Sequence, residues 1–506
     1  MALPLLAMLL ASVPAQADWV ELNKFNGIAE FFVTPGEIRL GLRLADSAVP
    51  AGTDLSAKSS ASPSAWLAQR LPVILAKNNQ PLAGRLLSLE HMAGNAAAMT
   101  GTGNGSNAYY EATLVYPIVE RLEKLAIIPP GGETIGLVLL HRGVPVTDLM
   151  PLKNKVNLNL DWNDPWRSRF DDPEFARRHA EPRSYLYIEP YEVRQELLLP
   201  LKDLKPWLDF GLRDGQYVEE DERAALKNKI GAFLLGRNPL SIDGANASPQ
   251  LDRVEFVCFD RTGVVPVDSQ GRLETASILV GVMLAYLTDH PARSLHLQWD
   301  LFGASSSERQ VSLIQGKESF DAYMTPKQPY FDWSQDESLG PASLNEVAND
   351  LTPPGAMQNP AVLDANETTP LLQALLHNAY RAFQLRDEEK AYDRLAVSLD
   401  GDLLEAIYLQ QRKAVLRQAK GLGGEGKVDR VDVLETQIQD FGQASGVLRL
   451  TARWLAYGTV SHWGHSHERH NLYQARLMLK NFKQGGGWKL VGMEFLDGQG
   501  LEYGAS

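Results

Sequence analysis

The stretch GVLRLTARWLAYGTV, at residues 446–460, decides the fold expected for the C-terminal third of the chain. Apolar and polar side chains alternate along it, and this period of two is that of a β-strand with one face in a core. The core face carries Leu448, Leu450, Ala452 and Trp454, and the other face carries Arg449, Thr451, Arg453 and Tyr457. Gly464 follows as a turning point, so the stretch predicts one arm of a long hairpin.

Further strands and a helical region surround this hairpin. The strand-like runs are DVLETQIQDF (432–441), LYQARLMLKNF (472–482) and WKLVGMEFL (488–496). Residues 370–419 are helical by period, with a break at Asp400-Gly401. Their apolar stripe consists of Leu372, Leu375, Leu376, Ala379 and Phe383. Helices followed by long antiparallel strands predict an α+β domain over residues 367–506.

This layout resembles the NTF2-like (SnoaL-type) superfamily, in which helices pack across a strongly curved sheet. The matching features are the helical entry at 370–419, the hairpin strands and the closing strand WKLV (488–491). The resemblance is one of layout, and it implies this fold. From about residue 137 the chain also resembles a group of uncharacterised exported bacterial proteins, in HRGVPVTDL (141–149), LDWNDPW (160–166), YLYIEPYEVR (185–194) and SHWGHSHERHNLY (461–473). That resemblance implies a shared architecture and brings no activity with it.

The N-terminus has the pattern of a secretory signal. An apolar run from Leu3 to Val13 is followed by AQA (15–17), a small-residue cleavage site, so residues 1–17 are expected to be a signal peptide. No Lys or Arg precedes the apolar run, and a buried N-terminal helix is the alternative. The single cysteine, Cys258, permits no intrachain disulfide, which is ordinary for bacterial periplasmic proteins. We therefore expect a periplasmic or secreted protein.

The rest of the chain predicts β-rich domains, so the expected fold class is mainly β with an α+β C-terminal domain. Residues 18–150 contain short alternating runs and loops, which predict a β-sandwich-like domain. Residues 151–335 predict a second β-rich domain with a helical insertion near 219–236. Residues 336–366 are rich in Pro, Asn, Asp and Ser and predict a linker.

Composition excludes some partners. The chain has 506 residues and a formal net charge of -13 without a long basic tract, so nucleic acid is not expected as a partner. The longest internal apolar run, at 278–287, is far shorter than the roughly 20 residues that a spanning helix requires. We read it as a buried strand and expect no transmembrane helix in the mature chain.

Four of the ten histidines lie within nine residues: His462, His465, His467 and His470. His465 and His467 are two apart, so in a strand they point the same way, with Cα atoms about 6.6 Å apart. Two imidazoles at that spacing can bind one zinc or copper ion, and His462 or His470 could supply a third ligand. The alternative interpretation is a hydrogen-bonded or packed hairpin end, or a patch that responds to pH.

A second candidate site is LDWNDPWRSRFDDPE, at residues 160–174, where Asp and Trp side chains alternate. Carboxylates could bind Ca²⁺ and indoles could stack on sugar rings. The spacing is not that of an EF-hand loop, and Asn-Asp and Asp-Pro are common in turns, so we favour a turn with Trp anchors. Cys258 lies in an apolar strand-like run and is read as a buried structural thiol.

The sequence shows no nucleophile elbow, zincin helix, phosphate-binding loop or dinucleotide fingerprint. The expected function is therefore that of an exported, non-enzymatic binding or assembly protein, with an unknown protein or small-molecule ligand as partner. No cofactor is assured. The alternative is a metal-binding protein or metal-dependent enzyme that uses the histidines at 462–470, with zinc or copper as the metal.

Overall fold

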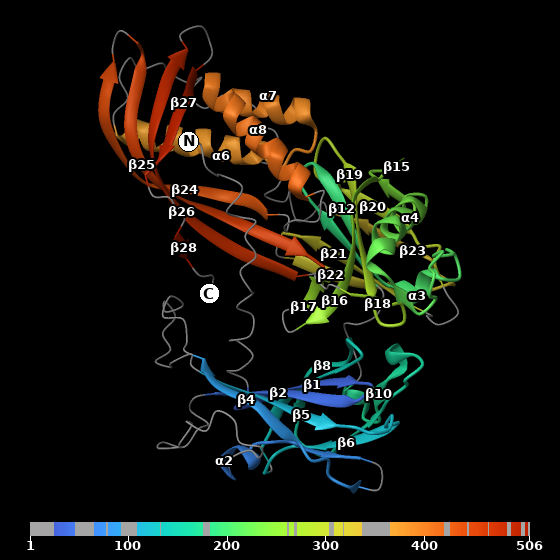
Figure 1. The fold of residues 1–506 in the computed structure, drawn as a ribbon. Coiled ribbons are helices and arrows are strands. Elements are labelled where there is room, and N and C mark those ends of the chain that lie inside the picture. The colour runs from blue at the N-terminus through green and yellow to red at the C-terminus, as the bar shows by residue number, and fades with distance from the viewer. Residues whose placement is uncertain are drawn as a thin grey trace.

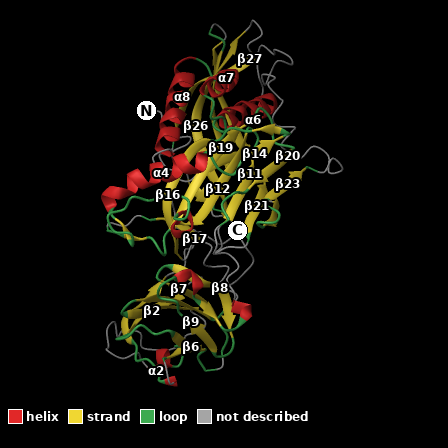
Figure 2. Ribbon diagram, turned by 90° about the vertical axis from the view of Figure 1, so that its right-hand side faces the viewer, coloured by secondary structure: helices red, strands yellow, loops and turns green. Residues whose placement is uncertain are grey.

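The structure of the protein is a computed structural model (Figure 1). It describes residues 25–45, 65–76, 79–92, 109–131, 133–175, 183–260, 263–267, 271–302, 308–316, 318–335, 365–418, 426–442, 445–463, 465–482, 487–496 and 501–503. Within these residues the chain is mainly β, as predicted, and its long helices lie toward the C-terminus (Figure 2). The expected signal peptide, and the expected linker as far as residue 364, lie outside the described residues.

The N-terminal unit, residues 27–175, contains a six-stranded and a four-stranded sheet. The first has the order β4 (Arg85–Met92), β5 (Tyr109–Pro117), β2 (Glu37–Ala45), β1 (Gly27–Thr34), β7 (Ile135–His141) and β8 (Val144–Leu152). The second has the order β10 (Arg169–Phe170), β9 (Val156–Asn159), β6 (Lys124–Ile128) and β3 (Val73–Leu75). The short helices are α2 (Ala65–Ala68), η4 (Pro165–Arg167) and η5 (Pro173–Phe175). Both sheets contribute to one apolar core, with Phe31 and Leu114 from the first and Leu158 from the second.

The boundary after this unit lies later than expected. We predicted that a second domain begins at residue 151, but β9 pairs with β6, and β10 pairs with β9. Both strands therefore belong to the first unit. The alternating run at 156–162 identifies a strand but does not specify which sheet it joins, because pairing depends on partners distant in sequence.

The middle unit, residues 183–334, is built on a seven-stranded sheet. Its order is β17 (Gly263–Pro266), β16 (Gln250–Asp260), β19 (Leu279–Leu287), β12 (Glu192–Pro200), β11 (Arg183–Ile188), β21 (Arg309–Gln315) and β22 (Glu318–Met324). The other strands are β13 (Tyr217–Val218), β14 (Leu240–Ile242), β15 (Ala245–Asn246), β18 (Leu273–Glu274), β20 (Ser294–Gln298) and β23 (Tyr330–Ser334). The helices are α3 (Leu201–Leu204), η6 (Glu220–Glu222) and α4 (Arg223–Leu235).

The large sheet has two different faces. One face packs against α3, α4 and the four-stranded sheet β15-β14-β20-β23, around Leu197, Val282 and Trp299. The run at 278–287 is the buried strand β19, as predicted. The expected helix near 219–236 is η6 followed by α4, with Gly236 as the C-cap of α4. The opposite face carries Tyr187, Met283 and a set of buried charges, and it meets the other two units.

The C-terminal unit, residues 365–503, contains three helices and one sheet. They are α6 (Ala365–Ala382), α7 (Glu388–Ser398), α8 (Gly401–Gln418), β24 (Gly426–Gly442), β25 (Val447–His462), β26 (His465–Phe482), β27 (Gly487–Phe495) and β28 (Leu501–Tyr503). The alternation in 446–460 is confirmed: Leu448, Leu450, Ala452 and Trp454 are buried against the helices. None of the described helices combines the length and the apolar composition needed to cross a membrane.

The middle unit lies between the other two (Figure 1). The long strands β25 and β26 extend away from the C-terminal helices, and their hairpin end reaches the seven-stranded sheet. From the other side, the N-terminal unit reaches the same region with β7 and β8 (Figure 2), and Val144 of β8 joins the same apolar cluster. The regions that carry the sequence-predicted sites therefore lie at junctions between units.

Candidate functional site

The histidine-rich stretch lies at the end of the hairpin formed by β25 and β26. His462 pairs with His465, so the chain reverses between these two residues. Alternation along the paired strands assigns positions 462, 465 and 467 to one face. The side chains of these three histidines lie outside the described residues. The predicted metal site therefore stays a prediction.

The fourth histidine is placed differently. His470 pairs with Tyr457 on the other face, where the two rings meet edge to face with centroids 4.7 Å apart. The guanidinium of Arg430 lies 4.0 Å from the centroid of the same tyrosine. His470 therefore belongs to a stack across three strands. Among the described side chains, no group of three or more His, Cys, Asp or Glu is placed to hold a metal ion.

Trp463, at the tip of this hairpin, is a residue that the sequence analysis did not single out. It has a positive φ of 48°, which is unusual for a large side chain, yet it is buried. Its indole lies over Gly281 of β19, where a Cβ atom would overlap the ring. Tyr187 and Met283 of the seven-stranded sheet belong to the same apolar cluster. The C-terminal hairpin is thus anchored on the middle unit by one aromatic side chain.

A buried carboxylate fixes the backbone of this anchor. The N–H group of Trp463 donates to Glu196 Oε2 over 2.5 Å, and the donor and acceptor are buried. Glu196 Oε1 lies 3.4 Å from Arg194 Nε, and both side chains are almost fully excluded from solvent. The guanidinium of Arg194 also lies 4.2 Å from the centroid of the Tyr187 ring. A buried ion pair and an aromatic ring of the middle unit therefore lie beneath the hairpin tip.

Ion pairs close the same junction at its edge. Arg386, between α6 and α7, donates to Glu192 over 2.5 Å and to Asp252 over 3.0 Å. Lys390 of α7 pairs with Asp289 in the loop between β19 and β20. These contacts join the C-terminal unit to two strands and one loop of the middle unit.

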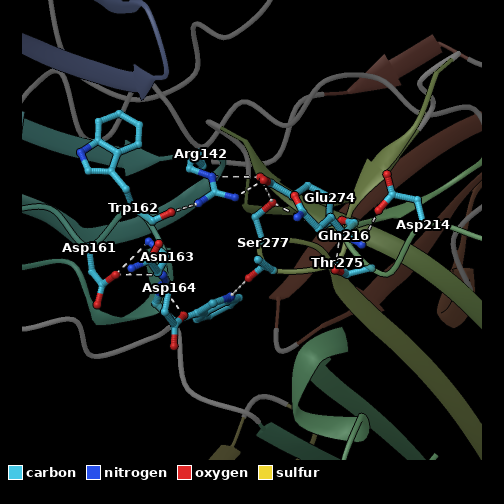
Figure 3. Close-up of polar contacts among 12 residues, drawn as sticks. Arg142, Asp161, Trp162, Asn163, Asp164, Asp214, Gln216, Glu274, Thr275 and Ser277 are labelled. Atoms are coloured by element: carbon cyan, nitrogen blue, oxygen red, sulfur yellow. Dashed lines mark hydrogen bonds and ion pairs between the residues drawn. The ribbon is translucent and has the colours of Figure 1, made fainter. Parts of the chain in front are cut away.

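The second sequence candidate, residues 160–174, lies at the opposite junction, and its interpretation as a turn with a Trp anchor is confirmed (Figure 3). Asp161 Oδ1 accepts from the N–H groups of Asn163 and Asp164, each over 2.9 Å. Asp164 caps the short helix η4 and pairs with Lys202 of α3 at 2.6 Å. Trp166 is buried and donates its indole N–H to a middle-unit carbonyl. These carboxylates are engaged in turn and junction contacts.

Arg142 lies in the tip of the β7–β8 hairpin and makes the main polar contact of this junction (Figure 3). It has a positive φ of 53°. Its guanidinium binds both carboxylate oxygens of Glu274 in β18, with Nε 3.0 Å from Oε2, and also donates to the carbonyl oxygen of Trp162. The two charged side chains retain only 13% and 27% of their exposure. This bidentate geometry specifies orientation as well as contact.

Beside Arg142, His141 is fully buried, and the sequence predicted no functional role for it. Its Nδ1 lies 2.7 Å from Ser168 Oγ, and Ser168 Oγ also accepts from the N–H of Asp161 over 3.0 Å. Its ring meets Trp162 edge to face. Burial, followed by the neighbouring Arg142 charge, lowers the pKa of His141 to about 4. Because Ser168 is buried as well, this Ser–His pair is a structural contact.

We expect the low pKa of His141 to make stability depend on pH. An unfolded histidine binds a proton near pH 6.5, whereas the folded ring resists protonation until about pH 4. Above about pH 6.5 the ring is neutral in both states and the free energy of unfolding is at its full value. As the pH falls toward 4, the free energy of unfolding decreases by about 3 kcal/mol. Urea unfolding of the wild type and of His141→Asn at pH 7, 5.5 and 4.5 measures it. The difference between the two proteins should shrink with falling pH, and a pH-independent difference would contradict the prediction.

A cavity of about 440 Å³ lies in the C-terminal unit, where α8 approaches strands β24 to β27. Its buried apolar members include Leu403 and Leu477, and its exposed charged members include Arg449, Arg476 and Glu494. Arg476 and Glu494 pair at 3.0 Å. The volume is within the range of small-molecule sites.

The outer edge of the middle unit is unusually aromatic. Strand β22 ends the seven-stranded sheet, and among the described strands it pairs only with β21. Phe320 and Tyr323 on β22 are each 57% exposed, and Tyr330 on β23 is 43% exposed. Phe320 stacks on Phe331 of β23, so the ends of the two sheets meet. We call Phe320, Tyr323 and Tyr330, with the side of β22 that pairs with no described strand, the aromatic edge.

Comparison of the sequence with models of known protein families gave no match, and comparison with curated proteins gave no significant match. The NTF2-like resemblance of the C-terminal unit therefore stays an expectation based on layout.

Proposed function

We propose that the protein is an exported, non-enzymatic binding or assembly protein that receives an extended segment of a partner protein at its aromatic edge. The observation that carries this proposal is the exposure of Phe320 and Tyr323 on the end strand β22, with the exposed Tyr330 on β23. Sheet edges in monomeric proteins are normally shortened, charged or covered, because free N–H and C=O groups pair with other chains. Strand β22 carries the exposed carboxylates Glu318 and Asp321, but its seven-residue length and its exposed aromatic side chains favour strand addition.

The pairing pattern of β22 specifies which backbone groups are available. Only two residues separate Gln315 from its partner Glu318, so this closing pair of the hairpin is a hydrogen-bonded one. Alternation then directs the N–H and C=O groups of Ser319, Asp321 and Tyr323 away from β21. These three residues form the row to which an added strand would bond. The exposed Glu318 and Asp321 favour a partner segment that is neutral or basic.

A photo-crosslinking amino acid at position 323 should give a discrete adduct with one partner protein in the native host. The same amino acid in place of Leu409, which is also exposed but lies on α8, should give none. Ser319→Pro should abolish the adduct, because it removes an outward N–H without removing a bond to β21. Ser319→Thr is the matched control and should retain it. Equal adducts at positions 323 and 409, or an adduct that persists in the Ser319→Pro variant, would contradict the proposal.

The finer description of the fold is part of the same proposal. We propose that the N-terminal and middle units are β-sandwich-like and that the C-terminal unit is NTF2-like. Support comes from the shared cores of paired sheets and from helices on one face of a long-stranded sheet. The cavity beside α8 could then hold a small-molecule ligand. Such a ligand would bind in addition to the protein partner, at a different site.

The alternative function is metal binding, and one observation favours it. The register places His462 directly opposite His465, and His467 lies two residues further along the same strand. Directly opposed residues have Cβ atoms about 5 Å apart, so the three positions could supply ligands to one zinc or copper ion. A metal carrier or metal-dependent enzyme would use this hairpin end.

Elemental analysis of untagged protein tests the alternative. If it is correct, about one zinc or copper ion per chain should copurify, and the double substitution His465→Ala, His467→Ala should remove it. Affinity should fall below about pH 6.5, because ligating imidazoles must be neutral. The double substitution His290→Ala, His296→Ala in the middle unit is the matched control and should leave the metal in place. Metal-free wild-type protein after growth with both metals would exclude this function.

A further inference from the structure

Two hairpin tips in different units are built alike. In the N-terminal unit, His141 pairs with Val144 and the loop between them begins with Arg142. In the C-terminal unit, His462 pairs with His465 and the loop begins with Trp463. Each loop has two residues, of which the second is glycine. The first residue of each has a positive φ, 53° for Arg142 and 48° for Trp463.

Local preference does not explain this choice of residues. A positive φ at the first position of a two-residue hairpin loop favours Asn, Asp or Gly, because a Cβ atom crowds the backbone there. Arg and Trp are large and carry no side-chain group that relieves the crowding. Strain of this kind persists where the surrounding structure requires the residue. For both tips, that requirement lies in the middle unit.

Each tip uses the same two types of contact with the middle unit. One is a carboxylate: Glu274 binds the guanidinium of Arg142, and Glu196 binds the N–H of Trp463. The other is apolar burial in one contiguous cluster, which we call the junction cluster. Its members are Val144, Trp166, Tyr185, Tyr187, Leu198, Val257, Val264, Leu279, Met283 and Trp463. Val144 and Trp166 come from the N-terminal unit and Trp463 from the C-terminal unit, so three units share one core.

We propose that the two tips are held cooperatively, so that release of Trp463 loosens the N-terminal junction and release of Arg142 loosens the C-terminal one. Because buried side chains pack closely, removing the indole takes away contacts within the cluster to which Val144 and Trp166 also belong. Coupling between two sites is reciprocal in free energy, so both directions must agree. This coupling goes beyond the proposed function, because it concerns how the units are held and not what binds the aromatic edge.

Hydrogen exchange of the full-length protein tests the coupling. Trp463→Asn should improve the local turn and yet expose the hairpin end, because Asn suits the positive φ but fills no space over Gly281. The diagnostic result is in the N-terminal unit, where exchange at 142–146 and 165–168 should rise about tenfold, within the usual range for coupled sites. Arg142→Asn should raise exchange at 458–463 by a similar factor. Circular dichroism should show that both variants retain their sheets.

A second variant keeps the test decisive if Trp463→Asn does not fold. Gly281→Ala adds one methyl group where the indole lies and should displace the ring without altering the hairpin. Gly215→Ala is the matched control, because a Cβ there meets nothing within 4 Å. Faster exchange at 142–146 in Gly281→Ala but not in Gly215→Ala supports the coupling. Unchanged exchange at 142–146 in a folded variant whose residues 458–463 exchange faster overturns it.

Discussion

Replacing Glu196 by alanine should lower the free energy of unfolding by about 3 kcal/mol, the lower end of the cost of removing one partner of a buried ion pair, because Glu189 still lies 3.8 Å from Arg194. The substitution leaves the guanidinium of Arg194 without the carboxylate 3.4 Å from its Nε, in a site with almost no access to water. It also removes the acceptor of the Trp463 N–H. Urea unfolding followed by circular dichroism measures the loss.

Glu196→Gln separates the two contributions. The amide oxygen can still accept from Trp463, but it carries no charge to balance Arg194. We therefore expect a smaller loss than for alanine, and normal hydrogen-exchange protection at the hairpin end. If alanine costs less than about 1 kcal/mol, the pair contributes no more than an exposed one, and the buried charges have another role.

The cores of the three units follow from periodicity in the sequence. The alternation from Leu448 to Trp454 predicted the buried face of β25, and the helical stripe that begins at Leu372 predicted the buried face of α6. Both patterns are local, and each has a period that only one type of secondary structure fits. The wholly apolar run of β19 is equally direct, because a strand covered on both faces needs no alternation.

The junctions could not be predicted in the same way. Arg142 and Glu274 are 132 residues apart, and Trp463 and Glu196 are 267 apart, so no local pattern connects them. A signal was nevertheless present: both tips have a bulky residue before glycine, where a two-residue turn favours Asn or Asp. A local preference that the sequence violates often marks a residue with a role elsewhere. The aromatic edge was missed because the order of strands in the sheet decides which strand is last.

Arg142→Asn should lower the free energy of unfolding by about 2–3 kcal/mol, and Glu274→Ala should cost a similar amount. The estimate lies below that for a fully buried pair because the side chains keep some exposure to solvent, 13% and 27%. Asn is chosen because it tolerates the positive φ of residue 142, so the loss reports the ion pair and not the turn.

The double substitution decides whether these two residues act on each other. If the bidentate contact contributes as its geometry indicates, the double variant should lose about 1.5–3 kcal/mol less than the sum of the two single losses. Arg449 and Asp440, an ion pair 3.1 Å apart with side chains 49% and 57% exposed, is the matched control. The double-mutant cycle of this control pair should give an interaction free energy below about 0.5 kcal/mol, because water and salt screen exposed charges. Additive losses at Arg142 and Glu274 would mean that apolar contacts, and not this ion pair, hold the N-terminal unit in place.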